Sequence, residues 1–362
     1  MQLSDEDIVM IGDSLQHMCK DLAGGLFARP EQTCEPTAFA QALDLFVDQG
    51  FVSVDDEPAC GLWDGCDDPA NLALTLQSLS TLGAVNAALA LSVHRSALSH
   101  HLLRQLRVKD KHDAHITLCL HGSHGIGRGE LANWWCGQAV DAAVLNDVFD
   151  PDRVCHTLIH SKTNRLLVPV FTNDTLAWRL THGAADGSRA GHGLDELHDG
   201  AFHAVQARVI QAPVGQDKAL SRDIWHREWL GLLAIQSGCV RKMVDMATQY
   251  SALRYQGGSL IAAHPAVQIM RTDMLAALAD VRTTLAAQRL SDQGFADMLL
   301  ARVRLQDGLN LAANAAMQTF GGVGYMRDTG IEKRWRDTNQ LRHQSGGALD
   351  MQLMAATWGV TA

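Results

Sequence analysis

The sequence predicts a multidomain α+β fold in which a helical domain, a β domain and a second helical domain follow one another. Apolar residues recur every three or four positions between Leu72 and Leu102, and again beyond residue 215, which is typical of amphipathic or buried helices. Between these regions the chain changes to short strand-like runs separated by Gly, Asn and Asp. We therefore expect domains at residues 1–112, 113–212 and 213–362.

The individual elements follow from local signals. Ser4 is a predicted N-cap for the first helix, because acidic residues at 5–7 occupy the first turn, where the helix dipole favours them. In the middle domain, residues 115–120, 143–145, 165–171 and 204–210 have strand character. Three long helices are expected in the last domain, over residues 228–254, 267–286 and 298–317.

The composition argues against several classes of protein. The 362 residues carry a formal net charge of −10, which argues against a nucleic-acid scaffold. No stretch approaches the roughly 18 unbroken apolar residues of a membrane span, and the acidic N-terminus lacks the pattern of a secretory signal. The eight cysteines form no Cys-x-x-Cys pair, so we expect reduced thiols, a cytoplasmic protein and no metal site. The histidines, including His94, are expected to be polar or core residues.

Two glycine-rich motifs follow long predicted helices. Residues 318–325 read Gln-Thr-Phe-Gly-Gly-Val-Gly-Tyr, and Arg336-Asp337 comes shortly after. Residues 254–258 read Arg-Tyr-Gln-Gly-Gly. Glycines let a backbone approach a flat or charged ligand, and an arginine at a helix end suits a phosphate. Taken alone, each motif is better interpreted as an ordinary helix end.

In this order, 64 residues apart, the two motifs resemble the acyl-CoA dehydrogenase family, as does the order of helical, β and helical domains. The resemblance is strong over residues 222–345 and poor in the β domain. It implies a middle small β-barrel, a C-terminal four-helix bundle and a flavoprotein that holds FAD between the β domain, the C-terminal helices and a neighbouring subunit. The implied FAD contacts are Arg254, Gln256, Ile261, His264, Gln318, Thr319 and Gly322. Gly257 and Pro265 depart from the family pattern, which has Phe and Gln there.

The resemblance also implies a reaction that needs a carboxylate base. A proton must leave the carbon beside a thioester while a hydride leaves the next carbon for flavin N5. Most family members carry a glutamate shortly after the Arg-Asp pair, but Ser345 occupies that position here. A branch that includes the isovaleryl- and long-chain-type enzymes places the base 26 residues before the arginine that binds phosphate, and that residue is Glu228. We therefore predict Glu228 as the base, with a helix-start acid as the structural alternative, and the Ser345 N–H as an oxyanion donor. Neighbouring His226 and Arg227 could tune its pKa if they face it.

The β domain matches the family least well. Ser123 and Trp135 are candidate stand-ins for the loop and strand that contact flavin in the family. The glycines at 125, 127 and 129 are better interpreted as a turn than as a dinucleotide fingerprint.

The resemblance predicts an FAD-dependent acyl-CoA dehydrogenase of lipid metabolism that passes electrons to an electron-transfer flavoprotein, as a homo-oligomer or with a second dehydrogenase subunit. Glycines in the altered pocket suggest a bulky acyl group such as a steroid or a branched chain. Two alternatives stay open: a non-catalytic or FAD-sharing subunit of a heteromeric dehydrogenase, and a flavin monooxygenase on the same fold.

Overall fold

The computed structural model describes residues 5–29, 32–54, 61–108, 115–120, 129–183, 192–204 and 207–361. The N-terminal part contains α1 (Asp5–Gly24), α2 (Pro36–Asp48), α3 (Pro69–Val85) and α4 (Ala87–Gln105). The Asp68 side chain accepts a hydrogen bond from the Ala70 N–H at the start of α3, and Asn86 does the same for the Leu89 N–H at the start of α4. Asn86 divides one long apolar stretch into two helices, because it ends α3 and caps α4. The predicted cap Ser4 lies outside the described residues.

The middle part is built around a four-stranded sheet in the order β1-β3-β4-β6, formed by Ile116–Leu118, Arg165–Thr172, Thr175–His182 and Arg208–Ile210. β1 and β3 are parallel, and the other neighbours are antiparallel. Strands β2 (Cys155–Ile159) and β5 (His198–Phe202) form a separate antiparallel pair. Asn173 and Asp174, with φ of 50° and 59°, form the tight turn between β3 and β4.

Two of the predicted strands differ from the structure. Residues 143–145 lie inside a helix, α6 (Ala142–Val148), because the Asp141 side chain caps it by accepting a hydrogen bond from the Ala143 N–H. In the run at 204–210, β6 covers Arg208–Ile210, and residues 205–206 lie outside the described residues. A further short helix, α5 (Glu130–Trp135), was not predicted. Strand propensity in short segments gives way to capping and packing of this kind.

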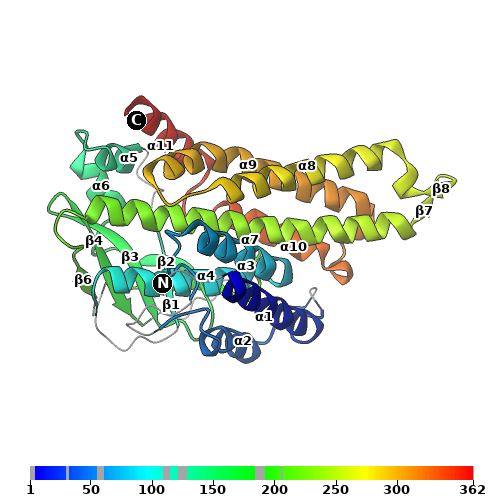
Figure 1. Ribbon diagram of the computed structural model, residues 1–362, viewed down its shortest axis with the longest axis horizontal. Coiled ribbons are helices and arrows are strands. Elements are labelled where there is room, and N and C mark those ends of the chain that lie inside the picture. The colour runs from blue at the N-terminus through cyan, green and yellow to red at the C-terminus, as the bar shows by residue number, and fades with distance from the viewer. Residues whose placement is uncertain are drawn as a thin grey trace.

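The C-terminal part is dominated by α7 (Asp217–Leu253), which runs along most of the molecule (Figure 1). After the β7–β8 hairpin (Tyr255–Gln256 and Ser259–Leu260) and the 3₁₀ turn η2 (Ile261–Ala263), the chain returns through α8 (Pro265–Ala287) and α9 (Asp292–Phe320). The turns η3 (Gly321–Tyr325) and η4 (Arg327–Thr329) lead into α10 (Ile331–Arg342) and α11 (Ala348–Thr361). All three predicted long helices are present, and each is longer than expected. Among the described helices, none is both long and apolar enough to cross a membrane.

Helices α3 and α7 cross closely because glycines lie at their contact. A Cβ on Gly238 would lie 1.8 Å from the Ser80 carbonyl oxygen, and one on Gly83 would lie 2.3 Å from the Ile235 carbonyl oxygen. No side chain fits at these distances, so the two backbones meet only because both positions are glycine. This crossing fixes α7 against the N-terminal helices.

We predict that G238A lowers the free energy of unfolding by about 1–3 kcal/mol, the usual cost of overpacking, because the added methyl group collides with rigid backbone. Thermal or denaturant unfolding measures the change. G308A is the matched control: its Cβ would lie 3.8 Å from the Ala277 Cβ, an ordinary contact, and it should be neutral or mildly stabilising. Equal stability of the two variants would contradict the proposed role of the crossing.

Candidate active site

Glu228 lies in the first half of α7, and its side chain is fully buried. Its Oε1 accepts hydrogen bonds from Arg95 Nε at 3.1 Å, from Arg95 Nη2 at 3.0 Å and from Ser345 Oγ at 2.6 Å. Its Oε2 lies 2.9 Å from His94 Nε2. The carboxylate therefore joins α7 to α4 and to the turn between α10 and α11.

The protonation of His94 follows from its second contact. Trp63 Nε1 donates to His94 Nδ1 at 3.1 Å. An indole N–H can only donate, so Nδ1 carries no proton and Nε2–H donates to Glu228. His94 is therefore neutral, and Arg95 is the charged partner that contacts Glu228.

Gly231 makes room for this histidine. It lies three residues after Glu228 on the same helix, and a Cβ there would be 2.3 Å from His94 Cε1. A side chain at this position would push the imidazole away from the carboxylate. The small residue in the middle of α7 is thus required by the site.

Burial alone would raise the pKa of Glu228, because a charged group is poorly solvated inside a protein. The positive charge of Arg95 and the hydrogen bonds from His94 and Ser345 outweigh burial and lower the pKa below its ordinary value. Glu228 is therefore ionised at neutral pH.

The structure brings the two predicted catalytic residues together. Ser345 lies in the turn after α10, with a left-handed φ of 54° and no exposed surface. Its carbonyl oxygen accepts a hydrogen bond from Trp229 Nε1 at 3.0 Å. The two positions in which the resemblance allows a base, 228 and 345, are thus neighbours in space although 117 residues separate them.

His226 and Arg227 contact other groups. His226 Nε2 lies 3.3 Å from Gln288 Oε1, and its ring packs against Phe295. Arg227 Nε donates to Asp223 at 2.8 Å. The hypothesis that these two residues face Glu228 is not supported, because successive residues of a helix point about 100° apart.

The predicted FAD contacts of the C-terminal helices gather at the other end of α7, near the β7–β8 hairpin (Figure 1). Arg254 and Gln256 are exposed there, and His264 Nε2 lies 2.9 Å from the Gln256 carbonyl oxygen. Ile261 is half-buried in η2, beside the hairpin. The Tyr250 and Phe320 rings stack with centroids 4.3 Å apart, which brings the end of α9 to the same region.

The second motif lies at that end of α9. Gln318 is exposed, whereas Thr319 is buried and its hydroxyl donates to the Ala315 carbonyl oxygen at 2.9 Å. A Cβ on Gly322 would meet nothing within 4 Å. An exposed guanidinium, amide side chains, an imidazole and open glycine backbone form a donor set that fits the diphosphate and ribose half of FAD.

The residues predicted in the β domain lie elsewhere. Trp135 is buried on α5: its Nε1 donates to Ser221 Oγ at 2.8 Å, and its ring packs edge-on against Trp225 and Phe295. It therefore belongs to the aromatic core near the start of α7 and is not brought together with Arg254. Ser123 lies outside the described residues.

The Arg336-Asp337 pair fastens α10 to the segment that precedes β5. Asp337 Oδ1 accepts the Leu194 N–H at 2.6 Å, and Arg336 forms two hydrogen bonds with Asp195. Gly193 is required beside them, because its φ is 132° and a Cβ would lie 2.5 Å from the Arg336 carbonyl oxygen. The motif thus has a structural role, because it joins α10 to the segment before β5.

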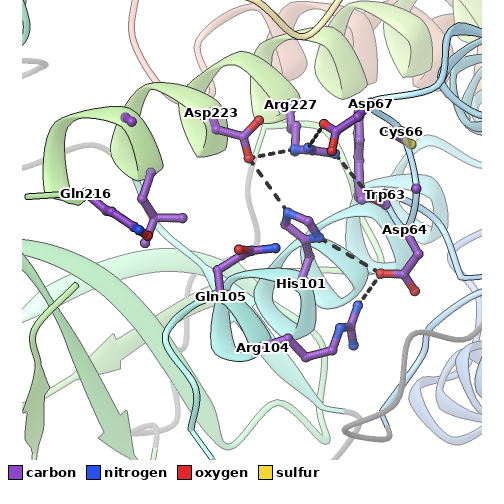
Figure 2. A pocket seen from close by; sticks show the side chains of 13 residues that line it. Trp63, Asp64, Cys66, Asp67, His101, Arg104, Gln105, Gln216, Asp223 and Arg227 are labelled. Atoms are coloured by element: carbon purple, nitrogen blue, oxygen red, sulfur yellow. Dashed lines mark hydrogen bonds and ion pairs between the residues drawn. The ribbon is translucent and has the colours of Figure 1, made fainter. Parts of the chain in front are cut away.

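A polar cavity of about 530 Å³ lies at the start of α7, between α4 and the 63–67 loop (Figure 2). Arg227 pairs with Asp223, and Arg104 pairs with Asp64 at 2.5 Å. His101 lies between the two aspartates, at 3.7 Å from Asp223 and 3.9 Å from Asp64. Each arginine of the cavity thus forms an ion pair with an aspartate of the same cavity. These pairs leave little positive charge to attract an anionic ligand. Within the described part of the chain, no cluster of three or more His, Cys, Asp or Glu could hold a metal ion.

Residues 219–357 match the family model of the acyl-CoA dehydrogenase C-terminal domain. The C-terminal part of the chain is therefore similar to that domain of acyl-CoA dehydrogenases. A cyclohex-1-ene-1-carbonyl-CoA dehydrogenase of Geobacter metallireducens is 31% identical over 114 residues, which cover 30% of each chain. The chain spans less than a third of the length of the first curated relatives that it matches, 28% and 30%.

The whole chain has the acyl-CoA dehydrogenase fold. An acyl-CoA dehydrogenase of Geobacillus kaustophilus superposes with a TM-score of 0.71 at 15% identity, over 98% of both chains. The structure of PigA with FAD and proline gives a TM-score of 0.73 at 15% identity over 100% of both chains. The resemblance and the fold class predicted from the sequence are confirmed.

Sequence reasoning missed the residues that surround Glu228 and the Ser345 turn. Arg95, Trp63 and Arg302 carry no motif, and His94 was expected to be a polar or core histidine. One signal was available: His94-Arg95 interrupts an otherwise largely apolar run between Ala87 and Leu103. A buried arginine needs an acid nearby, but the sequence does not say which one.

We predict that the protein loses stability as the pH falls from about 6.5 to about 4. Burial lowers the pKa of His226 to about 4 and that of His160 to about 3. Below about 6.5 the unfolded chain takes up protons that the folded chain does not bind, so unfolding is favoured by up to about 1.4 kcal/mol per pH unit and histidine. Thermal unfolding at pH 7.5, 6 and 5 measures the slope.

H226Q removes one of these groups and should flatten the slope. H17Q is the control, because the His17 side chain is 79% exposed, and it should leave the slope unchanged. A slope that is identical in the native protein and H226Q would show that His226 is not buried in its neutral form.

Proposed function

We propose that the chain is an FAD-dependent oxidoreductase of acyl-CoA thioesters that removes the α-proton with Glu228. The observation that carries the proposal is the 2.6 Å hydrogen bond between Ser345 Oγ and Glu228 Oε1. It supports the interpretation that a carboxylate from α7 serves the place that a glutamate after α10 serves in most family members.

The two carboxylate oxygens have different tasks in this proposal. Oε1 already accepts three hydrogen bonds, whereas Oε2 accepts one, from His94. Oε2 is therefore the oxygen with room for the substrate proton. The α C–H bond breaks, the proton goes to Oε2, and the electron pair moves towards the thioester oxygen, where the Ser345 N–H stabilises it.

FAD, when bound, would supply the hydride acceptor for the β-carbon. Arg254, Gln256 and the turn at Gly322 would hold its diphosphate and ribose half. Arg254 lies 26 residues after Glu228, about 39 Å along α7 at 1.5 Å per residue. We therefore propose that a neighbouring subunit, either a second copy or a different dehydrogenase subunit, brings these residues to the reaction site, and that an electron-transfer flavoprotein accepts the electrons.

The acyl group stays a proposal without structural support. Gly257, which suggested a bulky acyl group, lies in the β7–β8 turn, near the far end of α7 from Glu228. Its small size therefore gives no information about the space beside the base.

Arg95 affects how well Glu228 can act as the base. It keeps Glu228 unprotonated at neutral pH, as a base must be, but it also lowers the basicity of the carboxylate. The proposal thus requires substrate binding to loosen the Arg95 contact. R95Q should raise the pKa of Glu228 and move the acidic limb of the pH–rate profile upwards.

The closed network around Glu228 favours a second candidate, a non-catalytic subunit that shares an FAD site with a partner. Both carboxylate oxygens are occupied and the side chain has no exposed surface. Such an arrangement can also serve stability alone, as a buried ion pair that keeps its partners in place.

We predict that E228Q lowers the rate at which an acyl-CoA reduces bound FAD by about 10²–10⁴-fold, because glutamine cannot take the proton. Stopped-flow flavin bleaching measures the rate, and the FAD content checks that binding is intact. E6Q, an exposed glutamate of α1, is the control and should behave as the native protein. Unchanged bleaching in E228Q would refute Glu228 as the base and would favour an oxygen-using flavin enzyme.

Purification of the chain alone distinguishes the two candidates. A yellow protein whose flavin is bleached by an acyl-CoA supports the dehydrogenase. A colourless chain that acquires FAD and activity only with a second dehydrogenase subunit supports the non-catalytic role.

A further inference from the structure

Arg302 on α9 is fully buried behind the Ser345 turn. Its Nη2 donates to the Gln344 carbonyl oxygen at 2.8 Å, and its Nη1 lies 3.4 Å from the Ser345 carbonyl oxygen. The guanidinium also lies 5.4 Å from the centroid of the Trp229 ring. Nη1 also lies 3.4 Å from the Met351 sulfur, a weak acceptor. No carboxylate of the described residues lies within ion-pair distance of Arg302, so its strongest hydrogen bond is the one to the backbone of this turn.

Arg302 remains a cation under working conditions. Burial lowers its pKa to about 9, and the negative charge of Glu228 acts in the opposite direction. At neutral pH the site therefore holds the negative charge of Glu228 against the positive charges of Arg95 and Arg302, with His94 neutral. One positive charge is in excess, which favours negative charge that develops beside it.

The hydrogen bond to the Gln344 carbonyl oxygen acts on the Ser345 N–H. These two groups belong to one planar peptide unit. A charged donor on the oxygen polarises the unit and makes its N–H a stronger donor. Ser345 is buried, and none of the hydrogen bonds among the described residues uses its N–H. A buried N–H without an acceptor is costly, so this one is available for a ligand.

The base and this N–H share one residue, since Ser345 Oγ lies 2.6 Å from Glu228 Oε1. We infer that Arg302 is a positioning residue that orients and polarises the Gln344–Ser345 peptide, so that the Ser345 N–H stabilises the negative charge on a thioester oxygen when Glu228 takes the α-proton. This inference rests on the proposed function. It adds a residue that acts through the peptide and does not itself touch the substrate.

The experiment uses a 3-oxoacyl-CoA, whose acidic α C–H lets the proton transfer be observed without turnover. The absorbance of the bound enolate is titrated with pH in the purified native protein, R302Q, R302K and R304Q. R304Q is the matched control, because Arg304 lies two residues away on α9 and is 67% exposed. The kcat and KM for an acyl-CoA are measured alongside.

In R302Q the pKa of the bound 3-oxoacyl-CoA should rise by about one to two units, and kcat should fall about 10–100-fold, the usual effect of removing a supporting partner, with KM little changed. R302K keeps the charge but loses the planar fork of donors, so it should give intermediate values. R304Q should match the native protein.

A folded R302Q with the native enolate pKa and the native kcat would overturn the inference and leave the proposed function standing. If R302Q does not fold, R302K decides in the same way, because lysine keeps the charge but lacks the planar fork of donors that orients the peptide. If the native protein binds but never deprotonates the 3-oxoacyl-CoA, the proposed function fails first, and the role of Arg302 fails with it.

Discussion

The buried ion pair between Glu228 and Arg95 is the interaction on which the centre of the molecule depends. Two opposite charges without solvent stay in place only if each satisfies the other, and removal of one partner of such a pair costs about 3–5 kcal/mol. The carboxylate collects donors from α4 and from the turn after α10. Helix α4, helix α7 and the turn after α10 must therefore pack together before the Glu228 carboxylate has all its hydrogen-bond partners.

Helix α7 can carry this group because small residues let its neighbours approach. Gly231 admits the His94 ring, and Gly238 admits the backbone of α3. Both positions lower helix propensity by about 1 kcal/mol relative to alanine. Packing against α3 and α4 offsets that cost. The glycines that weaken the isolated helix therefore allow the close contacts that the folded protein needs.

The turn around Ser345 receives support from two sides. Trp229 and Arg302 donate to its carbonyl oxygens, while the Ser345 hydroxyl donates to Glu228. The Gln344–Ser345 peptide unit thus accepts a hydrogen bond from Arg302 at its carbonyl oxygen, and the Ser345 side chain contacts the Glu228 carboxylate. This arrangement suits a reaction in which negative charge appears briefly on a substrate oxygen, and it equally explains why the left-handed φ of Ser345 is tolerated.

The sequence by itself determined the order of helical, β and helical parts, the long C-terminal helices and the family resemblance, because apolar periodicity and the glycine motifs are local signals. The resemblance to a family branch implied Glu228, 26 residues before Arg254, as the carboxylate to consider. Only the tertiary structure decided that Glu228 pairs with Arg95 and that Ser345 and Arg302 lie beside it. The helix at 142–148, the place of Trp135 and the contacts of His226 were also decided by packing. Glu228 lies more than 100 positions from both Arg95 and Ser345, and no periodicity along the chain encodes which buried charge meets which.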